Sequence, residues 1–343
     1  MPGDSSKPFC NTVSDLVQVL RCSHGLRFSL DRHAAASGSF NAGVVSSHGI
    51  QMTLSRTTAL VSVVMLLLCI AALAQKDAVL VGAGDIASCD DLHGAEATAK
   101  LIDHIPGTVF AVGDLAYPDG SDEQFAKCYG PTWGRFKDRT RPAPGNHEYH
   151  SDGAPGYVRY FGVTAGDPKK GYYSYDLGGW HIVVLNSECE AVGGCNTGSP
   201  QEQWLRQDLN AHPAKCTLAY WHKPLFSSGA AHGNDPEVRP LWDTLYAANA
   251  DVVINGHDHH YERFAPQDPT GKPDAQRGIL EFVVGTGGKN SYRILATPKP
   301  NSEVRQADTF GVLKLTLHSD GYDWEFVPEA GKSFTDSGSG RCH

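Results

Sequence analysis

The sequence predicts an α/β fold of two packed mixed β-sheets flanked by helices, a four-layer α/β/β/α sandwich. Apolar segments of strand type alternate with segments of helical pattern from residue 78 to residue 255, and strands alone follow up to residue 327. Polar residues able to bind metals stand where several of these strands end. The carboxyl ends of strands are where open α/β sheets build their sites.

The elements of the first half follow from apolar runs and turn signals. The expected strands are 78–81, 108–112, 171–177 and 180–186, and the expected helices are 94–105 and a segment from 200 to about 212. Gly178 and Gly179 separate the last two strands, which is a hairpin signal. Ser199, Pro200 and Glu202 form a capping box with proline at the first helical position, which predicts the helix start.

The second half continues the alternation and ends in strands. We expect a helix near 240–248 and strands at 216–220, 251–255, 278–285, 310–318 and 322–327. The last two strands flank Asp320 and Gly321, a turn pair that predicts antiparallel pairing.

Five short polar segments carry the candidate chemistry. They are Gly84-Asp85, Gly113-Asp114 with Tyr117, Gly145-Asn146-His147-Glu148, Trp221-His222 and Gly256-His257-Asp258-His259. Carboxylate, amide and phenolate oxygens are hard ligands, and imidazole suits Zn, Fe and Mn. No cysteine stands in these segments, so a thiolate zinc site or an iron–sulfur cluster is not expected. The set matches two adjacent metal ions, with Asp114 as the candidate bridge.

Each Asp or His, taken singly, can equally be a loop residue with a local hydrogen bond. The occurrence of all five segments in one chain favours the metal centre over that alternative. In addition, the formal net charge of −9 argues against a nucleic-acid partner, because such proteins normally carry a basic face.

The order of these segments resembles that of the calcineurin-like metallophosphoesterases and, within them, the purple acid phosphatases. The pattern of that family is an Asp, then GDxxY, GNHE, a His after a strand, and GHxHxYER. The last motif here runs from Gly256 to Arg263 as Gly-His-Asp-His-His-Tyr-Glu-Arg. The resemblance covers residues 78–335.

The resemblance implies a ligand set for each metal. The first metal takes Asp85, Asp114, Tyr117 and His259, and the second takes Asp114, Asn146, His222 and His257. His147 is expected to face the substrate phosphate or to support the ligands. His232, ten residues after His222, is a candidate to protonate the leaving group, although it can equally be a solvated loop histidine.

One departure concerns the first metal. Many metallophosphoesterases have a histidine ligand two residues after the first Asp, where this chain has Ala87. Tyr117 replaces it, and a phenol with an ordinary pKa of about 10 needs a strongly Lewis-acidic ion to lose its proton near neutral pH. We therefore expect Fe(III) at the first site and Zn, Mn or Fe(II) at the second. The alternative for Tyr117 is a packed aromatic side chain beside Pro118.

The function implied is that of a secreted dinuclear-metal phosphatase. It would hydrolyse small phosphorylated molecules, namely phosphomonoesters, by attack of a metal-bound hydroxide. The alternatives are a phosphodiesterase or nucleotidase with the same metals, or a catalytically silent secreted metal-binding protein.

The N-terminal region has the sequence pattern of an export signal. Residues 59–74 form an uncharged apolar run that follows Arg56 and ends in Ala72-Leu73-Ala74, a cleavage pattern of signal peptides. We expect a disordered or mis-assigned leader at 1–51, a signal peptide at 52–74 and a catalytic domain at 75–343. An uncleaved membrane anchor is the lesser alternative. The mature protein would be secreted or periplasmic, without stable membrane insertion.

Six cysteines follow the predicted cleavage site, an even number that suggests disulfides in an exported protein. Of the 15 possible pairings we expect Cys89–Cys128, Cys189–Cys195 and Cys216–Cys342, with buried free thiols as the alternative. The segment Gly285–Lys289 lacks the spacing of a phosphate-binding loop. It is expected to be a tight loop near the metal site, whose small residues let substrate approach.

Overall fold

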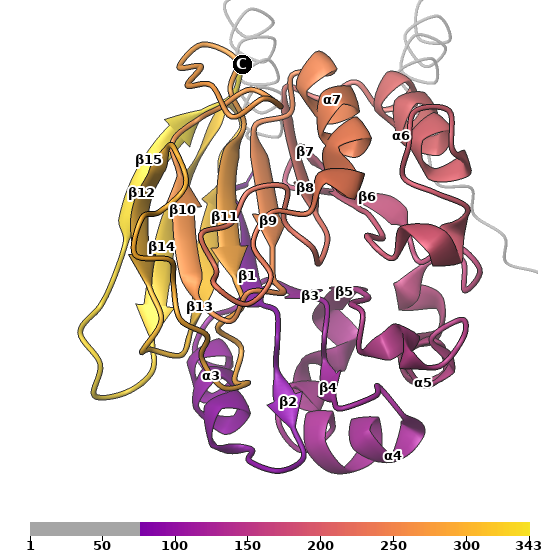
Figure 1. The fold of residues 1–343 in the computed structure, drawn as a ribbon, viewed down its shortest axis with the longest axis vertical. Coiled ribbons are helices and arrows are strands. Elements are labelled where there is room, and N and C mark those ends of the chain that lie inside the picture. Colours follow the sequence, from indigo (N-terminus) through magenta and orange to yellow (C-terminus); the bar gives the residue numbers. More distant parts are fainter. Residues whose placement is uncertain (1–75) are drawn as a thin grey trace, which may run out of the picture. The chain divides into compact units, whose positions relative to one another are not determined.

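Two β-sheets pack against each other in the computed structural model, which describes residues 76–343 (Figure 1). The interface between the sheets holds the larger hydrophobic core. Helices lie outside the sheets, so the predicted sandwich of mixed sheets and flanking helices is confirmed. The predicted leader and signal peptide, at 1–51 and 52–74, lie outside the described residues.

The first sheet has six strands in the order β15-β14-β13-β1-β3-β5. Their bounds are Ser337–Arg341, Gly321–Pro328, Gly311–Leu317, Ala78–Ala83, Thr108–Val112 and Thr140–Ala143. Strands β1, β3 and β5 are parallel, whereas β13 pairs with β1 in the antiparallel sense. The parallel strands bring the ends that follow Ala83 and Val112 to one edge of the sheet.

The second sheet has seven strands in the order β12-β10-β11-β9-β8-β7-β6. Their bounds are Ser302–Gln306, Tyr261–Phe264, Leu280–Val284, Val252–Asn255, Cys216–Tyr220, Trp180–Val184 and Tyr173–Leu177. Strands β7, β8, β9 and β11 are parallel. The hairpin of β6 and β7 confirms the prediction made from Gly178 and Gly179.

The helices cover the outer faces of the sheets. The longer ones are α3, α6 and α7, at His93–Asp103, Pro200–Ala211 and Arg239–Ala247, and the shorter are α4 at Asp122–Gln124 and α5 at Pro155–Phe161. A π-helical turn spans Phe125–Tyr129, and 3-10 turns span Trp133–Arg139, Glu148–His150, Gly162–Ala165, Cys189–Val192 and Pro236–Val238. Ser199 caps α6 as predicted by accepting from the Glu202 N–H, but the Glu202 carboxylate accepts from Gly198 instead of completing the box.

Alternation along the strands explains the layers. Ile182 and Val184 of β7 face the core between the sheets, whereas Val183 packs in a second core with residues of α6 and α7. Side chains of a strand point alternately to opposite faces, so one buried strand serves both cores. Burial on both faces also explains why β7, β8, β9 and β11 are buried along their whole length.

A two-stranded ladder lies beside the first sheet. Strand β2 at Ala87–Ser88 runs parallel to β4 at Ala116–Tyr117, and Ser88 pairs with Tyr117. The ladder begins with backbone hydrogen bonds from Asp85 and Ile86 to the carbonyls of Gly113 and Asp114. The loops that follow β1 and β3 therefore run side by side.

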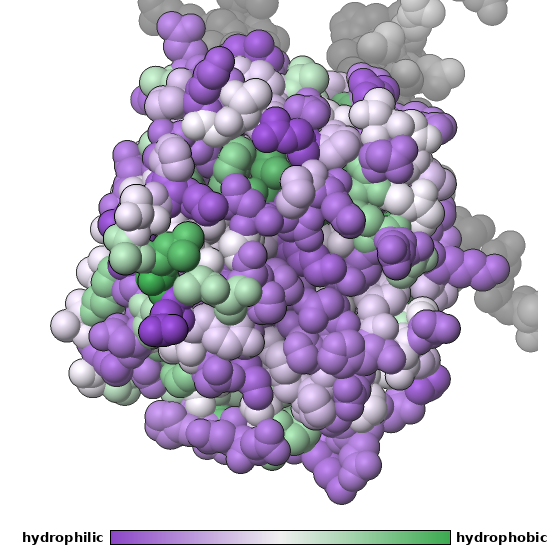
Figure 2. Space-filling view, viewed as in Figure 1, coloured by the Kyte–Doolittle hydropathy of each residue, from purple (hydrophilic) through white to green (hydrophobic). Residues whose placement is uncertain are grey.

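The three predicted disulfides are all present: Cys89–Cys128, Cys189–Cys195 and Cys216–Cys342. The face of the molecule in Figure 2 is mostly hydrophilic, with small separate apolar patches. Among residues 76–343, Val163 and Leu295 are the large hydrophobic side chains that are exposed. No helix in this range is long and apolar enough to cross a membrane.

Candidate metal centre

The predicted site residues gather where four parallel strands end. Asp85 follows β1, Asp114 follows β3, His222 follows β8, and His257 follows β9. Asp85, Asp114 and His222 are buried. The carboxyl edges of the two sheets thus supply one shared polar cluster, as expected for an open α/β sheet.

The hydroxyl of Tyr117 stands at the centre of one half of the cluster. It is 2.9 Å from Asp85 Oδ1, 3.1 Å from Asp114 Oδ2 and 3.1 Å from His259 Nε2. His259 Nε2 also lies 3.3 Å from Asp85 Oδ1. These four side chains, which come from three separate loops, therefore direct their polar atoms at one point.

The other half of the cluster contains two histidines. His222 Nε2 is 3.2 Å from Asp114 Oδ2 and 3.2 Å from His257 Nδ1. The candidate ligand atoms of Asp114, His222 and His257 all lie within 4.8 Å of one another. Asp114 Oδ2 belongs to both halves, which is the position that a bridging carboxylate requires.

Three of these residues have strained backbones. Asp85, Asp114 and His257 have positive φ angles of 59°, 54° and 72°. Such conformations cost about 1–3 kcal/mol each in a residue other than glycine, and they persist where the surrounding contacts enforce them. Here the Asp85 carboxylate accepts the His257 N–H at 2.9 Å, and the Asp114 carboxylate accepts the His147 N–H at 2.9 Å.

The glycines before the ligands allow close packing. A Cβ atom on Gly145 would lie 2.2 Å from Asp114 Oδ1, and one on Gly113 would lie 2.3 Å from the His222 ring. Both distances are impossible contacts, so any other residue would displace a candidate ligand. The Gly-Asp and Gly-Asn pairs of the sequence are therefore a steric requirement of the site.

Main-chain carbonyls orient two of the histidine rings. His222 Nδ1 is 3.0 Å from the Val112 carbonyl, and His259 Nδ1 is 2.6 Å from the Asn290 carbonyl. A carbonyl accepts only from a protonated nitrogen, so both contacts place the N–H at Nδ1. In the neutral ring the lone pair of Nε2 is then directed into the cluster, in the manner of histidines that bind metals.

The electrostatics of the cluster are dominated by its carboxylates. Burial opposes ionisation of Asp114, but the charge of His222, together with hydrogen bonds from His222 and His147, outweighs it and holds the Asp114 pKa well below its usual range. Burial likewise opposes protonation of His222, and the Asp114 carboxylate outweighs it and raises the His222 pKa to about 10. Burial and the charges of Asp114 and Asp85 raise the Tyr117 pKa well above its usual value. The cluster thus favours positive charge at its centre.

A protein-family model matches the part of the chain that carries the candidate metal ligands. The model described as calcineurin-like phosphoesterase matches residues 74–261. The chain belongs to this family. The match spans all four strand ends that carry candidate ligands, as well as the predicted motifs up to Tyr261. The resemblance that the motifs predicted is therefore confirmed.

Relatives of this chain include purple acid phosphatases from plants. Purple acid phosphatase 21 from Arabidopsis thaliana is 29% identical over 267 residues, which cover 68% of this chain and 57% of that protein. The chain spans about half the length of the curated relatives it matches, at 57%, 54% and 45% of three Arabidopsis purple acid phosphatases.

Solved structures show the same fold. A purple acid phosphatase from yellow lupin (Lupinus luteus) seeds superposes with a TM-score of 0.62 at 20% identity, over 77% of this chain and 54% of that chain. GAP50, the anchor in the inner membrane complex of Plasmodium, superposes with a TM-score of 0.59 at 13% identity, over 78% of this chain and 89% of that chain. Because one of these proteins is a phosphatase and the other an anchor, the fold alone does not decide activity.

The donor set of the candidate site fits a metal centre. Asn146 Oδ1 is buried and has no hydrogen-bond partner within residues 76–343. Buried polar atoms are nearly always paired, so an unpaired oxygen beside the cluster indicates a ligand position. Oxygen and imidazole donors without thiolates suit Fe, Zn and Mn.

The two predicted catalytic histidines lie at the rim of the cluster. His147 Nε2 is 3.7 Å from Asp114 Oδ2, and its Nδ1 contacts the Pro118 carbonyl. The His232 ring stacks on the His257 ring with centroids 4.0 Å apart. An open pocket of about 520 Å³ is lined by His232, His257 and Asn146, among others. The structure therefore brings both histidines to the rim of the site, where His147 contacts Asp114 and His232 contacts His257.

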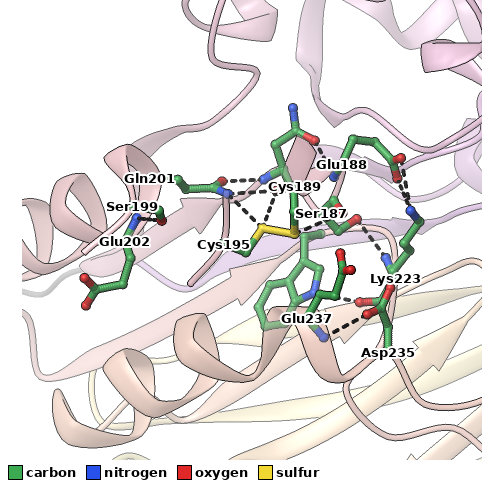
Figure 3. The surroundings of a disulfide bond; sticks show 12 residues. Ser187, Glu188, Cys189, Cys195, Ser199, Gln201, Glu202, Lys223, Asp235 and Glu237 are labelled. Atoms are coloured by element: carbon green, nitrogen blue, oxygen red, sulfur yellow. Dashed lines mark hydrogen bonds and ion pairs between the residues drawn. A yellow bond between two sulfur atoms is a disulfide. The ribbon is translucent and has the colours of Figure 1, made fainter. Parts of the chain in front are cut away.

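Lys223 lines the same pocket. Its ammonium is 3.0 Å from each carboxylate oxygen of Glu188. Figure 3 shows this pair beside the Cys189–Cys195 disulfide, which closes the loop that follows Glu188. The Lys223 N–H also donates to Ser187 Oγ at 3.0 Å. The disulfide-closed loop thus fixes a cation next to the candidate ligand His222.

Two supporting residues have no role in the prediction made from the sequence. Glu148 accepts the N–H groups of Asp114, Leu115 and Gly145. Asp258 accepts from Gly233 N at 2.9 Å and from His232 N at 3.2 Å, and so anchors the loop that carries His232. Both residues stand inside motifs that the sequence analysis identified, so their nearness to the site could be predicted. The groups that donate to them could not, because most of these lie on loops distant in sequence.

Two other groups of potential ligands do not form metal sites. His181, Asp208 and His212 lie together, but the rings of the two histidines stack with centroids 5.1 Å apart and 17° between their planes. A ring nitrogen binds a metal within the ring plane, so two nearly parallel stacked rings cannot direct their lone pairs at one ion. In the second group, Cys216 and Cys342 are joined in a disulfide.

Proposed function

We propose that the chain is a secreted, metal-dependent phosphatase that hydrolyses phosphomonoesters at a dinuclear centre. The observation that carries the proposal is the convergence on Asp114 Oδ2, where Tyr117 OH lies at 3.1 Å and His222 Nε2 at 3.2 Å. One carboxylate oxygen that faces two separate groups of donors is what a pair of bridged ions requires.

The proposed ligands follow the two halves of the cluster. Asp85, Asp114, Tyr117 and His259 would hold the first ion, for which the phenolate favours Fe(III). Asp114, Asn146, His222 and His257 would hold the second, a Zn, Mn or Fe(II) ion. The two ions would supply Lewis acidity to the phosphate and lower the pKa of a bound water.

The residues around the centre would bind and orient the phosphate ester. His147 is fixed through Nδ1 by the Pro118 carbonyl, so its Nε2 faces Asp114 and the site. His232 is fixed through its main chain by Asp258 and lines the pocket. Either imidazole could hold a proton at the leaving-group oxygen, a role worth about 10²–10⁴-fold in rate.

Export is supported by the cysteines. All six cysteines after residue 75 are paired in three disulfides. Disulfides persist in oxidising compartments and are rare in the cytosol. We therefore infer a secreted or periplasmic protein, whose substrate would be a small phosphorylated molecule.

The test is an assay of the full chain after export and metal loading. Iron and a second divalent metal are quantified per chain, and hydrolysis is measured with a panel of phosphomonoesters and phosphodiesters. Faster hydrolysis of monoesters is expected. Faster hydrolysis of diesters would favour a phosphodiesterase, and two bound metals without hydrolysis of either class would overturn the enzymatic proposal.

A further inference from the structure

The glycine-rich segment Gly285–Lys289 packs against the metal centre from the end of strand β1. The Gly287 N–H donates to the Gly84 carbonyl at 2.9 Å, and the Lys289 N–H donates to the Asp85 carbonyl at 2.8 Å. A Cβ atom on Gly287 would lie 2.4 Å from the Gly84 oxygen. The small residues therefore allow contact with the protein itself, rather than leaving room for substrate.

This packing places the side chain of Lys289 on the candidate tyrosine ligand. Its ammonium lies 4.9 Å from the centroid of the Tyr117 ring and donates to Ser88 Oγ at 3.0 Å. Ser88 pairs with Tyr117 in the ladder of β2 and β4, so the anchor of the ammonium is fixed relative to the ring. A cation within about 6 Å of an aromatic face is attracted to it.

The charges around Tyr117 are arranged asymmetrically. Its hydroxyl faces the carboxylates of Asp85 and Asp114. The ammonium of Lys289 lies over the face of the ring. Among the described residues, no other Lys or Arg side chain lies over this ring. The half-buried position of Lys289 reduces screening of its charge by solvent. The ammonium is therefore well placed to act on the electrons of the ring.

We propose that Lys289 is a positioning residue for the tyrosine ligand, whose fixed cation sets the energy of charge transfer between the Tyr117 phenolate and the metal. This inference rests on the proposed function, because it requires Tyr117 to bind ferric iron. It assigns to the glycine-rich segment the role of holding a cation against the ring of the candidate ligand Tyr117.

The direction of the effect follows from Coulomb's law. Charge transfer moves an electron from the phenolate ring to the metal, and therefore away from Lys289. The ammonium stabilises the state before transfer more than the state after it. It thus raises the transition energy, and loss of the cation lowers that energy.

The test compares visible spectra of the iron-loaded full chain. Lys289→Met should move the charge-transfer band to longer wavelength, with unchanged iron per chain, because the apolar side chain fills similar space without the charge. Lys289→Arg should keep the band near its original position, since guanidinium retains the charge and stacks on aromatic rings. Lys100→Met, at the exposed last turn of α3, is the matched control and should change nothing.

Three outcomes would overturn the inference. They are an unmoved band in an iron-replete Lys289→Met protein, an equal shift in Lys289→Arg, and a colourless wild-type protein that still hydrolyses phosphate esters. The last result would leave the phosphatase proposal intact, whereas a coloured protein without hydrolysis would overturn only that proposal. If Lys289→Met does not load iron, Ser88→Ala releases the ammonium without removing it, and a smaller shift to longer wavelength is expected.

Discussion

Glu148 holds Asp114 through its main chain, because Glu148 Oε2 accepts the Asp114 N–H at 2.9 Å and the Gly145 N–H at 2.8 Å. Its other oxygen accepts from Leu115 at 2.8 Å. One buried carboxylate thus joins the loop after β3 to the loop that carries Asn146. Burial and the charge of Asp114 raise the pKa of Glu148 to about 8.

Glu148→Gln should weaken the metal centre while the fold is retained. An amide offers one oxygen, so its NH₂ group must face a backbone N–H that now lacks an acceptor. Loss of such a supporting group typically costs about 10–100-fold in metal affinity or activity. Metal titration and kcat/KM measure the loss, and the exposed Glu123→Gln is the matched control. Unchanged values in both measurements would show that Glu148 does not support the site.

Asp114→Asn should nearly abolish hydrolysis. A neutral amide bridges two cations poorly, and Asp114 is the carboxylate that faces both groups of donors. We expect loss of bound metal and a fall in kcat of at least about 10²–10³-fold, the scale for removing one fixed electrostatic stabiliser. Metal analysis and steady-state kinetics check this result. Full metal content with wild-type turnover would exclude a bridged pair of ions at Asp114.

The elements that sequence predicts well here are those determined by local pattern. Strands such as Thr108–Val112 and Cys216–Tyr220 have the predicted bounds because an apolar run ends two residues before a polar residue, Asp114 or His222. The candidate ligands could be predicted because they stand at those strand ends. Strand β10, by contrast, follows the GHxHxYER ligands directly and carries Glu262 and Arg263, so its pattern hides a strand that is paired on both sides.

The supporting contacts could not be predicted, because they join segments far apart in the chain. The distance of Lys289 from Tyr117 depends on Gly287 packing against Gly84, which no local pattern reports. The glycine-rich segment lies beside the candidate metal centre, as expected. Its small residues pack against the protein, however, and do not leave room for substrate, so that part of the expectation was wrong. Similarly, the contact of Asp258 with the loop of His232 requires β8 and β9 to be neighbours.

His181 should stabilise the fold most at mildly acidic pH. Its ring lies between Asp208 at 2.9 Å and Asp176 at 3.0 Å. Burial opposes protonation, but hydrogen bonds to the two carboxylates outweigh it and raise the His181 pKa. Because the folded-state pKa is raised, this stabilisation is complete below the unfolded value of about 6.5 and is lost as pH rises through the folded value.

The matching experiment is His181→Gln, with unfolding free energies measured at pH 6 and pH 9. Other polar groups in contact are His212, which stacks on the ring, and Ser174, which donates to Asp208. The variant should lose about 1.5–3 kcal/mol at pH 6, the range for hydrogen bonds to charged groups, and less at pH 9. Exposed His104→Gln serves as the control. An equal loss at both pH values would contradict a charged His181.

The Cys216–Cys342 disulfide should contribute more stability than the Cys189–Cys195 disulfide. The first closes a separation of 126 residues and the second a separation of 6. On the loop-closure model, removing them costs about 5 and about 2 kcal/mol respectively. Denaturant unfolding of the two double Cys→Ser variants tests the order, and a larger loss from the short loop would contradict it.

In addition, alkylation of the exported protein without reduction should label no cysteine.

Tyr117→Phe should remove the colour of the iron-loaded protein and leave the fold intact. Ala87 cannot bind a metal, and the Tyr117 hydroxyl lies 2.9 Å from Asp85 and 3.1 Å from His259, where a replacement ligand is needed. A bond between tyrosinate and Fe(III) absorbs visible light, so loss of the hydroxyl alone abolishes the absorption. Visible spectra, iron per chain and thermal unfolding measure the three effects. An active wild-type protein that is colourless and holds only Zn or Mn would show that the ferric assignment is wrong. The phosphatase proposal would survive that result, because the remaining ligands can still hold two divalent ions.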